Sequence, residues 1–260
     1  MRVRIIFTLI NKGTTLPFHH QNLLSTFIKN QLIGNVQQNY PSYNFSGLKG
    51  QTKVSRVGLH FYSSKVTLVV SSPSKSWIDS FLKSVFEQTE IKIGELKLIP
   101  ESAELENEVD LSNPTKYVCI SPIVIAGAED THAKNFISPE DDTFSDILYE
   151  VIIKQMEATQ LYTPEALASF FKFQIVPDKA YLQKIKQEEK KFARIYTTLN
   201  KYNTVEFRGY TFPFTLWADE VVQRFVFECG LGCYNNIGFG MIDVTLASYQ
   251  KTTTPYTILM

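Results

Sequence analysis

Histidine is the side chain best suited to move a proton near neutral pH, because its ordinary pKa is about 6.5. The chain has four histidines. His60 lies in the stretch VGLHFYS, which predicts a strand, and His132 lies in the polar stretch AEDTHAKN, which predicts a solvated loop. His19 and His20 lead into a stretch with helical apolar spacing. Proton transfer is the chemistry they could supply, and decoration of a helix start is the plainer alternative.

A second chemical feature is the glycine-rich stretch GLGCYNNIGFGM. Gly230, Gly232, Gly238 and Gly240 lie within eleven residues. A helix end and a strand entry explain one or two of these glycines. Close approach of the backbone to a ligand, with amides turned toward phosphate oxygens, would explain all four. The stretch is not a P-loop, because no GK[ST] follows, and it is not a dinucleotide fingerprint, because it precedes a strand. Both explanations stay open.

Composition narrows the class of protein. The 26 basic and 26 acidic residues balance, so a polyanion partner would have to bind a local patch such as the base-rich segment Lys179–Arg194. Cys119, Cys229 and Cys233 lack the spacing of a disulfide framework or a zinc site, and we expect reduced, structural thiols. The sequence has neither a signal-peptide pattern nor an apolar run of about 20 residues. We therefore expect a cytoplasmic protein without a membrane partner.

The predicted elements follow one order twice. VRIIFTLI predicts a strand, HHQNLLSTFIKNQL a helix, VGLHFYS and KVTLVVSS a hairpin, SPSKSWIDSFLKSVFEQ a helix and IKIGELKLIP a strand. The acidic stretch ESAELENEVDLSNP indicates a linker. The order repeats with KYVCISPIVIAG, DTFSDILYEVIIKQMEA, two strands on either side of the basic segment, DEVVQRFVFECG and MIDVTLAS. This β-α-β-β-α-β order predicts an α+β protein with two tandem ferredoxin-like domains, residues 1–110 and 115–260.

Several stretches resemble a known family. The late loop has the pattern G-x-G-x-x-x-x-x-G-F-G-M, from Gly230 to Met241. YNFSGL is similar to an aromatic segment after the first helix, YVCISPIVI to a Ser-Pro strand that opens the second domain, and LPFHHQNLL to a segment with a His-Gln pair. Over nearly its whole length the chain resembles the CRISPR-associated repeat-RNA endoribonucleases, the Cas six family. The glycine loop is the most specific part of the resemblance.

The resemblance implies an activity. Members cleave CRISPR repeat RNA in the precursor transcript without a metal and release guide RNAs. The ribose 2′-hydroxyl is the nucleophile, and the products are a cyclic phosphate and a 5′-hydroxyl. No cofactor is implied, because the nucleophile belongs to the RNA. The implied partners are the precursor RNA and other CRISPR effector subunits, and a homodimer is left open.

The resemblance also indicates site residues. His20, which Gln21 follows, fits the proton-transfer position better than His19. Lys29 and Lys49 are candidates for stabilising charge on the phosphate, with a solvated lysine as the plainer alternative. The residues expected to contact RNA are Gly230, Gly232, Gly238, Gly240, Lys53, Lys184, Lys186, Lys190, Lys191 and Arg194.

One departure from the family bears on the activity. Many members carry a catalytic histidine between the first helix and the YNFSGL segment, whereas here that interval, IGNVQQNYPS, has none. Either the His-Gln position has taken over, or lysines do the charge work, or the protein binds repeat RNA without cutting it. A third class, a tandem ferredoxin-like protein that binds a small anion at the glycine loop, is the remaining alternative.

Overall fold

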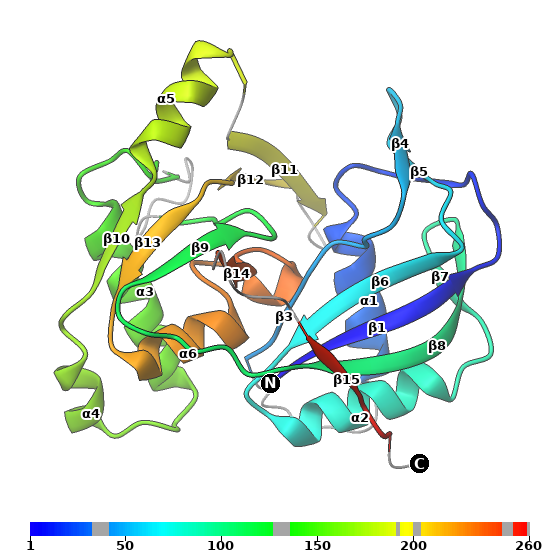
Figure 1. Ribbon diagram of the computed structural model, residues 1–260, viewed down its shortest axis with the longest axis horizontal. Coiled ribbons are helices and arrows are strands. Elements are labelled where there is room, and N and C mark those ends of the chain that lie inside the picture. Colours follow the sequence, from blue (N-terminus) through cyan, green and yellow to red (C-terminus); the bar gives the residue numbers. More distant parts are fainter. Residues whose placement is uncertain (33–41, 127–135, 191–192, 200–203, 246–251, 259–260) are drawn as a thin grey trace. The chain divides into compact units, whose positions relative to one another are not determined.

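The computed structural model describes all residues except 33–41, 127–135, 191–192, 200–203, 246–251 and 259–260. The chain divides into two compact units (Figure 1). Unit 1 comprises Met1–Glu108, Asn236–Gly238 and Gln250–Met260, and unit 2 comprises Val109–Asn235 and Phe239–Tyr249. Each unit has its own hydrophobic core and its own antiparallel sheet. No helix in the described parts of the chain is long and apolar enough to cross a membrane.

Unit 1 has the ferredoxin-like topology. Its main sheet has the strand order β15-β8-β1-β6-β3, with β7 paired to β8. The sequence of elements β1-α1-β3-β6-α2-β8 and the spatial order β8-β1-β6-β3 define that fold. The bounds are β1 (Arg2–Leu9), α1 (Gln21–Gln31), β3 (Asn44–Phe45), β6 (Lys65–Ser71), α2 (Lys75–Phe86), β7 (Ile91–Ile93), β8 (Leu96–Glu106) and β15 (Thr253–Pro255).

The two helices of unit 1 form where their apolar residues recur at helical spacing. In α1 the buried side chains include Leu24, Phe27 and Ile28, and Phe27 packs edge-on against Phe81 of α2. Ser74 begins α2, because its hydroxyl accepts a hydrogen bond from the Trp77 amide. The apolar faces of both helices therefore pack against the sheet and form one hydrophobic core with it.

The predicted hairpin of VGLHFYS with KVTLVVSS is wrong. β5 (Leu59–Phe61) pairs with β2 (Thr15–Leu16) and β4 (Thr52–Val54) in a separate three-stranded sheet, which we call the small sheet. β6 pairs instead with β1 and β3. The apolar run of β6 suits a strand that is buried on both faces, whereas the alternating β5 suits a sheet with one solvent-facing side.

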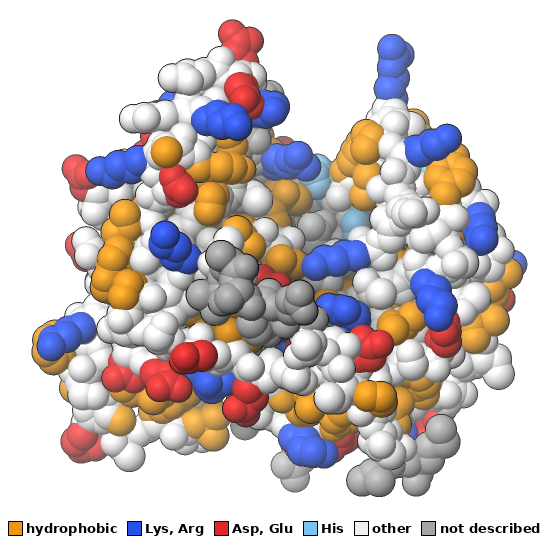
Figure 2. All heavy atoms as spheres, in the orientation of Figure 1, with side chains coloured by type: hydrophobic (Ala, Val, Ile, Leu, Met, Phe, Trp, Pro, Cys, Tyr) orange, Lys and Arg blue, Asp and Glu red, His pale blue; other side chains and the backbone are white. Residues whose placement is uncertain are grey.

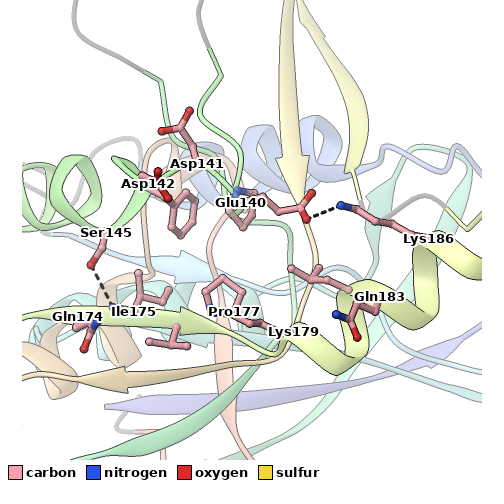
Figure 3. Close-up of a pocket in the computed structure, with 14 residues that line it drawn as sticks. Glu140, Asp141, Asp142, Ser145, Gln174, Ile175, Pro177, Lys179, Gln183 and Lys186 are labelled. Atoms are coloured by element: carbon pink, nitrogen blue, oxygen red, sulfur yellow. Dashed lines mark hydrogen bonds and ion pairs between the residues drawn. The ribbon is translucent and has the colours of Figure 1, made fainter.

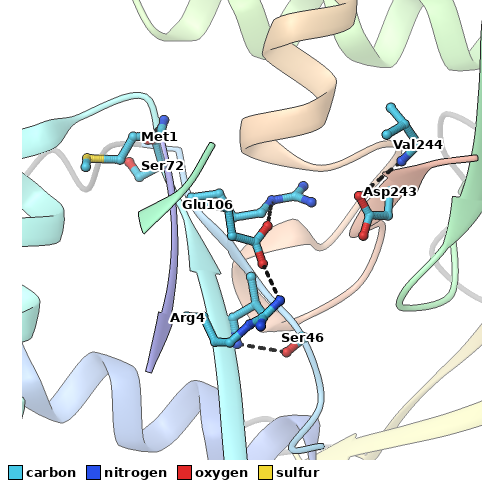
Figure 4. Close-up of polar contacts among 9 residues, drawn as sticks. Met1, Arg4, Ser46, Ser72, Glu106, Asp243 and Val244 are labelled. Carbon is cyan, nitrogen blue, oxygen red and sulfur yellow. Dashed lines mark hydrogen bonds and ion pairs between the residues drawn. The ribbon is translucent and has the colours of Figure 1, made fainter. Parts of the chain in front are cut away.

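The predicted linker is also wrong over its first half. Residues 101–106 continue β8, where Glu104 lies opposite Arg4 of β1 and Glu101 pairs with Lys65 of β6. Glu106 is buried and lies 3.4 Å from the Arg4 guanidinium (Figure 4) and 3.9 Å from that of Arg2. The predicted domain boundary at the C-terminus also needs correction: residues 250–260 belong to unit 1, because β15 pairs with β8.

Unit 2 repeats the topology. Its sheet has the order β10-β13-β9-β14, with elements β9 (Thr115–Cys119), α3 (Phe144–Ala158), β10 (Gln174–Pro177), β13 (Phe214–Trp217), α6 (Glu220–Cys229) and β14 (Ile242–Val244). A short helix α4 (Pro164–Ser169) precedes β10, and a 3-10 turn η1 (Asn235–Ile237) follows α6. An insertion between β10 and β13 holds α5 (Lys179–Gln187) and the hairpin of β11 (Ala193–Leu199) and β12 (Thr204–Tyr210). The predicted α+β class with tandem ferredoxin-like domains is confirmed.

Candidate nucleic-acid interface

The four glycines of the late loop share one backbone property. Gly230, Gly232, Gly238 and Gly240 have φ angles of 93°, 90°, 89° and 75°. These values lie in the left-handed region, where other residues are strained. Gly230 ends α6, and its amide donates to the Val226 carbonyl at 2.9 Å. The need for four glycines thus follows first from the path of the backbone.

Two of these glycines also allow close approach of the protein to itself. A Cβ at Gly232 would lie 2.6 Å from the Val124 carbonyl oxygen, and one at Gly240 would lie 2.2 Å from that of Leu231. The Gly240 amide donates to the Pro122 carbonyl at 2.7 Å. The amides of Gly230 and Gly240 are therefore used inside the protein, which removes support from the anion-cradle explanation.

Gly238 packs within unit 1. The carbonyl of Asn236 accepts hydrogen bonds from the Ser25 hydroxyl at 3.3 Å and from the Tyr43 hydroxyl at 3.2 Å. A Cβ at Gly238 would lie 2.7 Å from a ring carbon of Phe45. Phe45 belongs to the YNFSGL segment, so two of the segments that carry the family resemblance pack together here.

The two adjacent histidines differ in environment. His20 is buried, its Nδ1 donates to the Pro17 carbonyl at 3.1 Å, and its Nε2 accepts from the Leu48 amide at 3.2 Å. Burial lowers the pKa of His20, against the effect of the Pro17 carbonyl, and His19 lowers it further. The structure thus holds a neutral His20 with both ring nitrogens bonded, which suits positioning of the chain better than proton transfer. His19 is exposed to solvent.

The lysines expected near these histidines lie on different elements. Lys29 is exposed in the last turn of α1. Lys49 is exposed, and its backbone pairs with Thr67. Lys53 is exposed on β4, with its ammonium 5.2 Å from the ring centroid of Tyr62. All three belong to unit 1.

More than half of the basic segment 179–194 forms the helix α5. Lys184 is exposed on α5, and Arg194 is exposed on β11. The Lys186 ammonium lies 2.6 Å from the Glu140 carboxylate, and that of Lys190 lies 2.7 Å from Glu188. Lys191 lies outside the described residues. Of the four lysines predicted from this segment to contact RNA, two, Lys186 and Lys190, therefore already face a carboxylate.

A pocket of about 580 Å³ lies beside β10 in unit 2 (Figure 3). Pro177, at the end of β10, is among its lining residues. Its charged side chains are Glu140, Asp141, Asp142, Lys179 and Lys186. The ion pair of Glu140 with Lys186 neutralises one carboxylate and one ammonium group. Two carboxylates and one ammonium group remain, so negative charge is in excess. This excess disfavours phosphate, and the pocket is not part of the candidate RNA site.

No metal centre is present among the described residues, where no cluster of three or more His, Cys, Asp or Glu side chains could hold an ion. All three cysteines are thiols rather than disulfides. Burial raises the pKa of the Cys119 thiol to about 12, and its Sγ donates to the Phe212 carbonyl at 3.1 Å. Cys119 therefore stays protonated at neutral pH and has a structural role.

A comparison with protein families decides the identity. The family model described as CRISPR associated protein Cas6, C-terminal, matches residues 105–244, which is more than half of the chain. The chain belongs to the Cas6 family. Membership confirms the resemblance seen in the glycine loop and leaves no support for a metabolic anion-binding protein of another class.

Two curated relatives have the Cas6 name and nearly the same length. The CRISPR-associated endoribonuclease Cas6 1 of Methanocaldococcus jannaschii is 24% identical over 88% of this chain and 87% of its own. An endoribonuclease-like Cas6 protein of Pyrococcus furiosus is 20% identical over 94% of this chain and 98% of its own. A solved structure of a CRISPR associated protein Cas6 has a TM-score of 0.77, with 21% identity, over 95% of this chain and 99% of that chain. This structural similarity concerns the fold.

Sequence reasoning overlooked the charge of the N-terminal region. No Asp or Glu occurs before Asp79, although the first 78 residues include nine Lys and Arg. Arg56 and Tyr62, which lie in this region beside Lys53, were not among the predicted site residues. A count of acids along the chain would have found the region.

Proposed function

We propose that this Cas6 protein binds CRISPR repeat RNA in the precursor transcript and cleaves it without a metal. The observation that carries the proposal is the family match over residues 105–244. The full-length relative named as an endoribonuclease supports RNA cleavage. Association with other CRISPR effector subunits or with a second copy of the chain is part of the same prediction.

The proposed reaction is an internal transesterification. The ribose 2′-oxygen forms a bond to phosphorus and loses its proton, while the bond from phosphorus to the 5′-oxygen breaks and that oxygen gains a proton. The products are a cyclic phosphate and a 5′-hydroxyl. Aligning the three atoms and stabilising the added charge on phosphorus are the tasks of the protein.

We assign the proton transfer to His19 rather than His20. His19 is exposed, so RNA can approach its ring, whereas the ring of His20 is buried and both of its nitrogens are bonded within the protein. His20 acts as a positioning residue that holds the start of α1 against the 47–48 segment. Lys29 and Lys49 are the proposed sources of positive charge, both exposed on unit 1.

Binding without cleavage is the second candidate function. The observations that favour it are the two hydrogen bonds of the His20 ring and the lack of histidine in IGNVQQNYPS. In this case the fold and the RNA surface serve recognition alone.

One experiment separates the two functions. The protein is incubated with the repeat RNA of its own CRISPR array in EDTA, and the products are resolved and their ends analysed. A shorter product with a cyclic phosphate, absent when the scissile ribose is 2′-deoxy, supports cleavage. Binding of the intact RNA with no product supports the second function, and no binding at all contradicts both.

A further inference from the structure

Eight of the nine bases of the N-terminal region, all but Lys49, fall into two groups. Arg4, Lys65 and Lys75 reach carboxylates of β8 or α2, and Arg2 lies near Glu106. Four others form no ion pair within the described parts of the chain: Lys12, Lys29, Lys53 and Arg56. Three of these four, all but Lys29, lie on the small sheet or in the segments that lead into it. The small sheet thus concentrates positive charge that no carboxylate offsets.

The small sheet has one buried and one solvent-facing side. Leu16 and Phe61 are fully buried in the core of unit 1. Side chains alternate along a strand, so the residues next to them point the other way. Thr15, His60 and Lys53 are directly paired across the three strands, and they share that outward face.

The outward face combines an aromatic ring with a cation. Tyr62 lies two residues after His60, so it extends the same face, and its side chain is 45% exposed. The Lys53 ammonium lies over the Tyr62 ring. The His60 ring is oriented by hydrogen bonds of its Nδ1 with the Gly13 carbonyl at 3.1 Å and the Thr15 hydroxyl at 2.8 Å.

The tip of the β4–β5 hairpin adds to this face. Arg56 is exposed at the tip, between Val54 and Val57, which are each 74% exposed. The Ser55 amide donates to the Gly58 carbonyl at 2.9 Å and closes the turn. Over this end of unit 1, Figure 2 shows Lys and Arg side chains among hydrophobic ones and no acidic side chain on the face in view.

We propose that the outward face of the small sheet binds an unpaired stretch of RNA, an inference that rests on the proposed function. A base would stack on Tyr62 in place of the Lys53 ammonium, which would then pair with the adjoining phosphate, and Arg56 would contact a further phosphate. Aromatic rings beside cations are the usual means of binding unpaired nucleic acid, because every base offers a flat face. The lack of acids over the first 78 residues favours a polyanion over a protein partner.

The test compares variants on two RNAs, one with an unpaired flank beside the repeat and one trimmed to its paired part or core. Tyr62→Ala should weaken binding of the flanked RNA by about 5- to 150-fold, the effect of one stacked base. Tyr62→Phe should retain most of the affinity, because it keeps the ring. Lys53→Ala should reduce the slope of log affinity against log salt by about 0.7, the value for one phosphate contact on a single strand. Lys65→Ala is the matched control, since Lys65 is an exposed lysine of the same unit that pairs with Glu101.

The outcomes distinguish this inference from the proposed function. If the unaltered protein binds the flanked RNA but Tyr62→Ala and Lys53→Ala bind it equally well, the small sheet is not an RNA surface and the proposed function stands. An equal loss of affinity for both RNAs would also overturn the inference, because the flank would play no part. If the unaltered protein binds neither RNA, both proposals are wrong.

Discussion

Two regions of the chain are rich in basic residues, and they differ in what the fold places beside them. In unit 2, Lys186 and Lys190 of the segment 179–194 lie within 2.7 Å of Glu140 and Glu188. In unit 1, the bases of the small sheet have no carboxylate beside them in the described structure, and Lys53 lies over an aromatic ring instead. We therefore expect a local excess of bases in the sequence to favour RNA only where the fold places no carboxylate beside those bases.

The expected difference in RNA affinity between the two regions follows from how exposed ion pairs behave in water. The Lys186 and Lys190 side chains are 59% and 69% exposed, so water screens each pair and each contributes little to stability. RNA could displace these carboxylates, but each new phosphate contact would replace an existing pair. A lysine of the small sheet gains a phosphate contact without losing a carboxylate, and its contribution to affinity should be larger.

The largest expected effect concerns catalysis by His19, which lies in the N-terminal region that has no Asp or Glu. His19→Ala should lower the single-turnover cleavage rate by about 10²–10⁴-fold, the usual scale for acid–base catalysis. His20→Ala should lower the stability of the fold, because two buried hydrogen bonds are lost. Its folded fraction should cleave more slowly than the unaltered protein, because the start of α1 is held less firmly, but faster than His19→Ala. Rates are measured at saturating protein, with the folded fraction obtained from urea unfolding. A slow, fully folded His20→Ala protein beside a normal His19→Ala protein would return the catalytic role to His20.

The glycine loop is a third region that could contact RNA, in addition to the two basic regions. Gly238→Ala should destabilise the protein by about 1–3 kcal/mol, because its Cβ would overlap the Phe45 ring and the backbone there is left-handed. RNA affinity of the folded variant should be unchanged. Urea unfolding and RNA titration check the two parts separately. A well-folded Gly238→Ala protein with weak binding would make the loop itself an RNA contact, as the sequence first indicated.

Removing carboxylates should make the unit 2 region resemble the unit 1 region. In the double variant Glu140→Gln with Glu188→Gln, Lys186 and Lys190 lose their partners and become able to contact phosphate. If RNA passes near them, the slope of log affinity against log salt should become steeper by about 0.7–0.9 for each new contact. Asp146→Asn with Glu150→Gln removes two exposed acids of α3 that have no ion pair among the described residues, and it is the control for the same change in net charge. An unchanged slope would place the α5 region away from the RNA.

The smallest effect is the pH dependence of His20. Burial lowers its pKa below the ordinary value of about 6.5. As the pH falls below that value, the unfolded chain takes up a proton before the folded chain does, so the free energy of unfolding decreases. His20→Gln should lose this part of the pH dependence, whereas the exposed His19→Gln should keep it. Urea unfolding at pH 7.5 and pH 5.5 provides the measurement, and an equal acid sensitivity in all three proteins would rule out His20 as the group responsible.

The fold was predictable where periodicity is strong. The long strands and amphipathic helices of both units show a period of 2 or 3.6 residues in the sequence. The two-residue strand β3 has no period to detect, and its pairing with β6 depends on residues 25 and 27 positions away. The acidic run 101–106 was taken for a linker because the bases that its carboxylates face, Arg4 and Lys65, are distant in the sequence.

The candidate site was predictable in part. The glycine positions follow from the sequence, but their contacts with Val124, Leu231 and Phe45 are long-range and could not be read from it. The pairing of Lys186 with Glu140 likewise spans 46 positions. The preference for His20 over His19 failed to foresee the burial of His20, which depends on Gly47 and Leu48 of a later segment.

The most direct test of the account compares two variants with equal loss of charge. One carries Lys53→Ala with Arg56→Ala in unit 1, and the other carries Lys186→Ala with Lys190→Ala in unit 2. Affinity for repeat RNA with an unpaired flank is measured from about 50 to 200 mM salt, the range over which phosphate contacts have a large effect. The first variant should lose about 1.4 from the slope of log affinity against log salt, at about 0.7 for each contact on a single strand, and the second should keep the slope of the unaltered protein. The reverse pattern, with the slope lost only in the second variant, would contradict the claim that uncompensated charge determines where RNA binds.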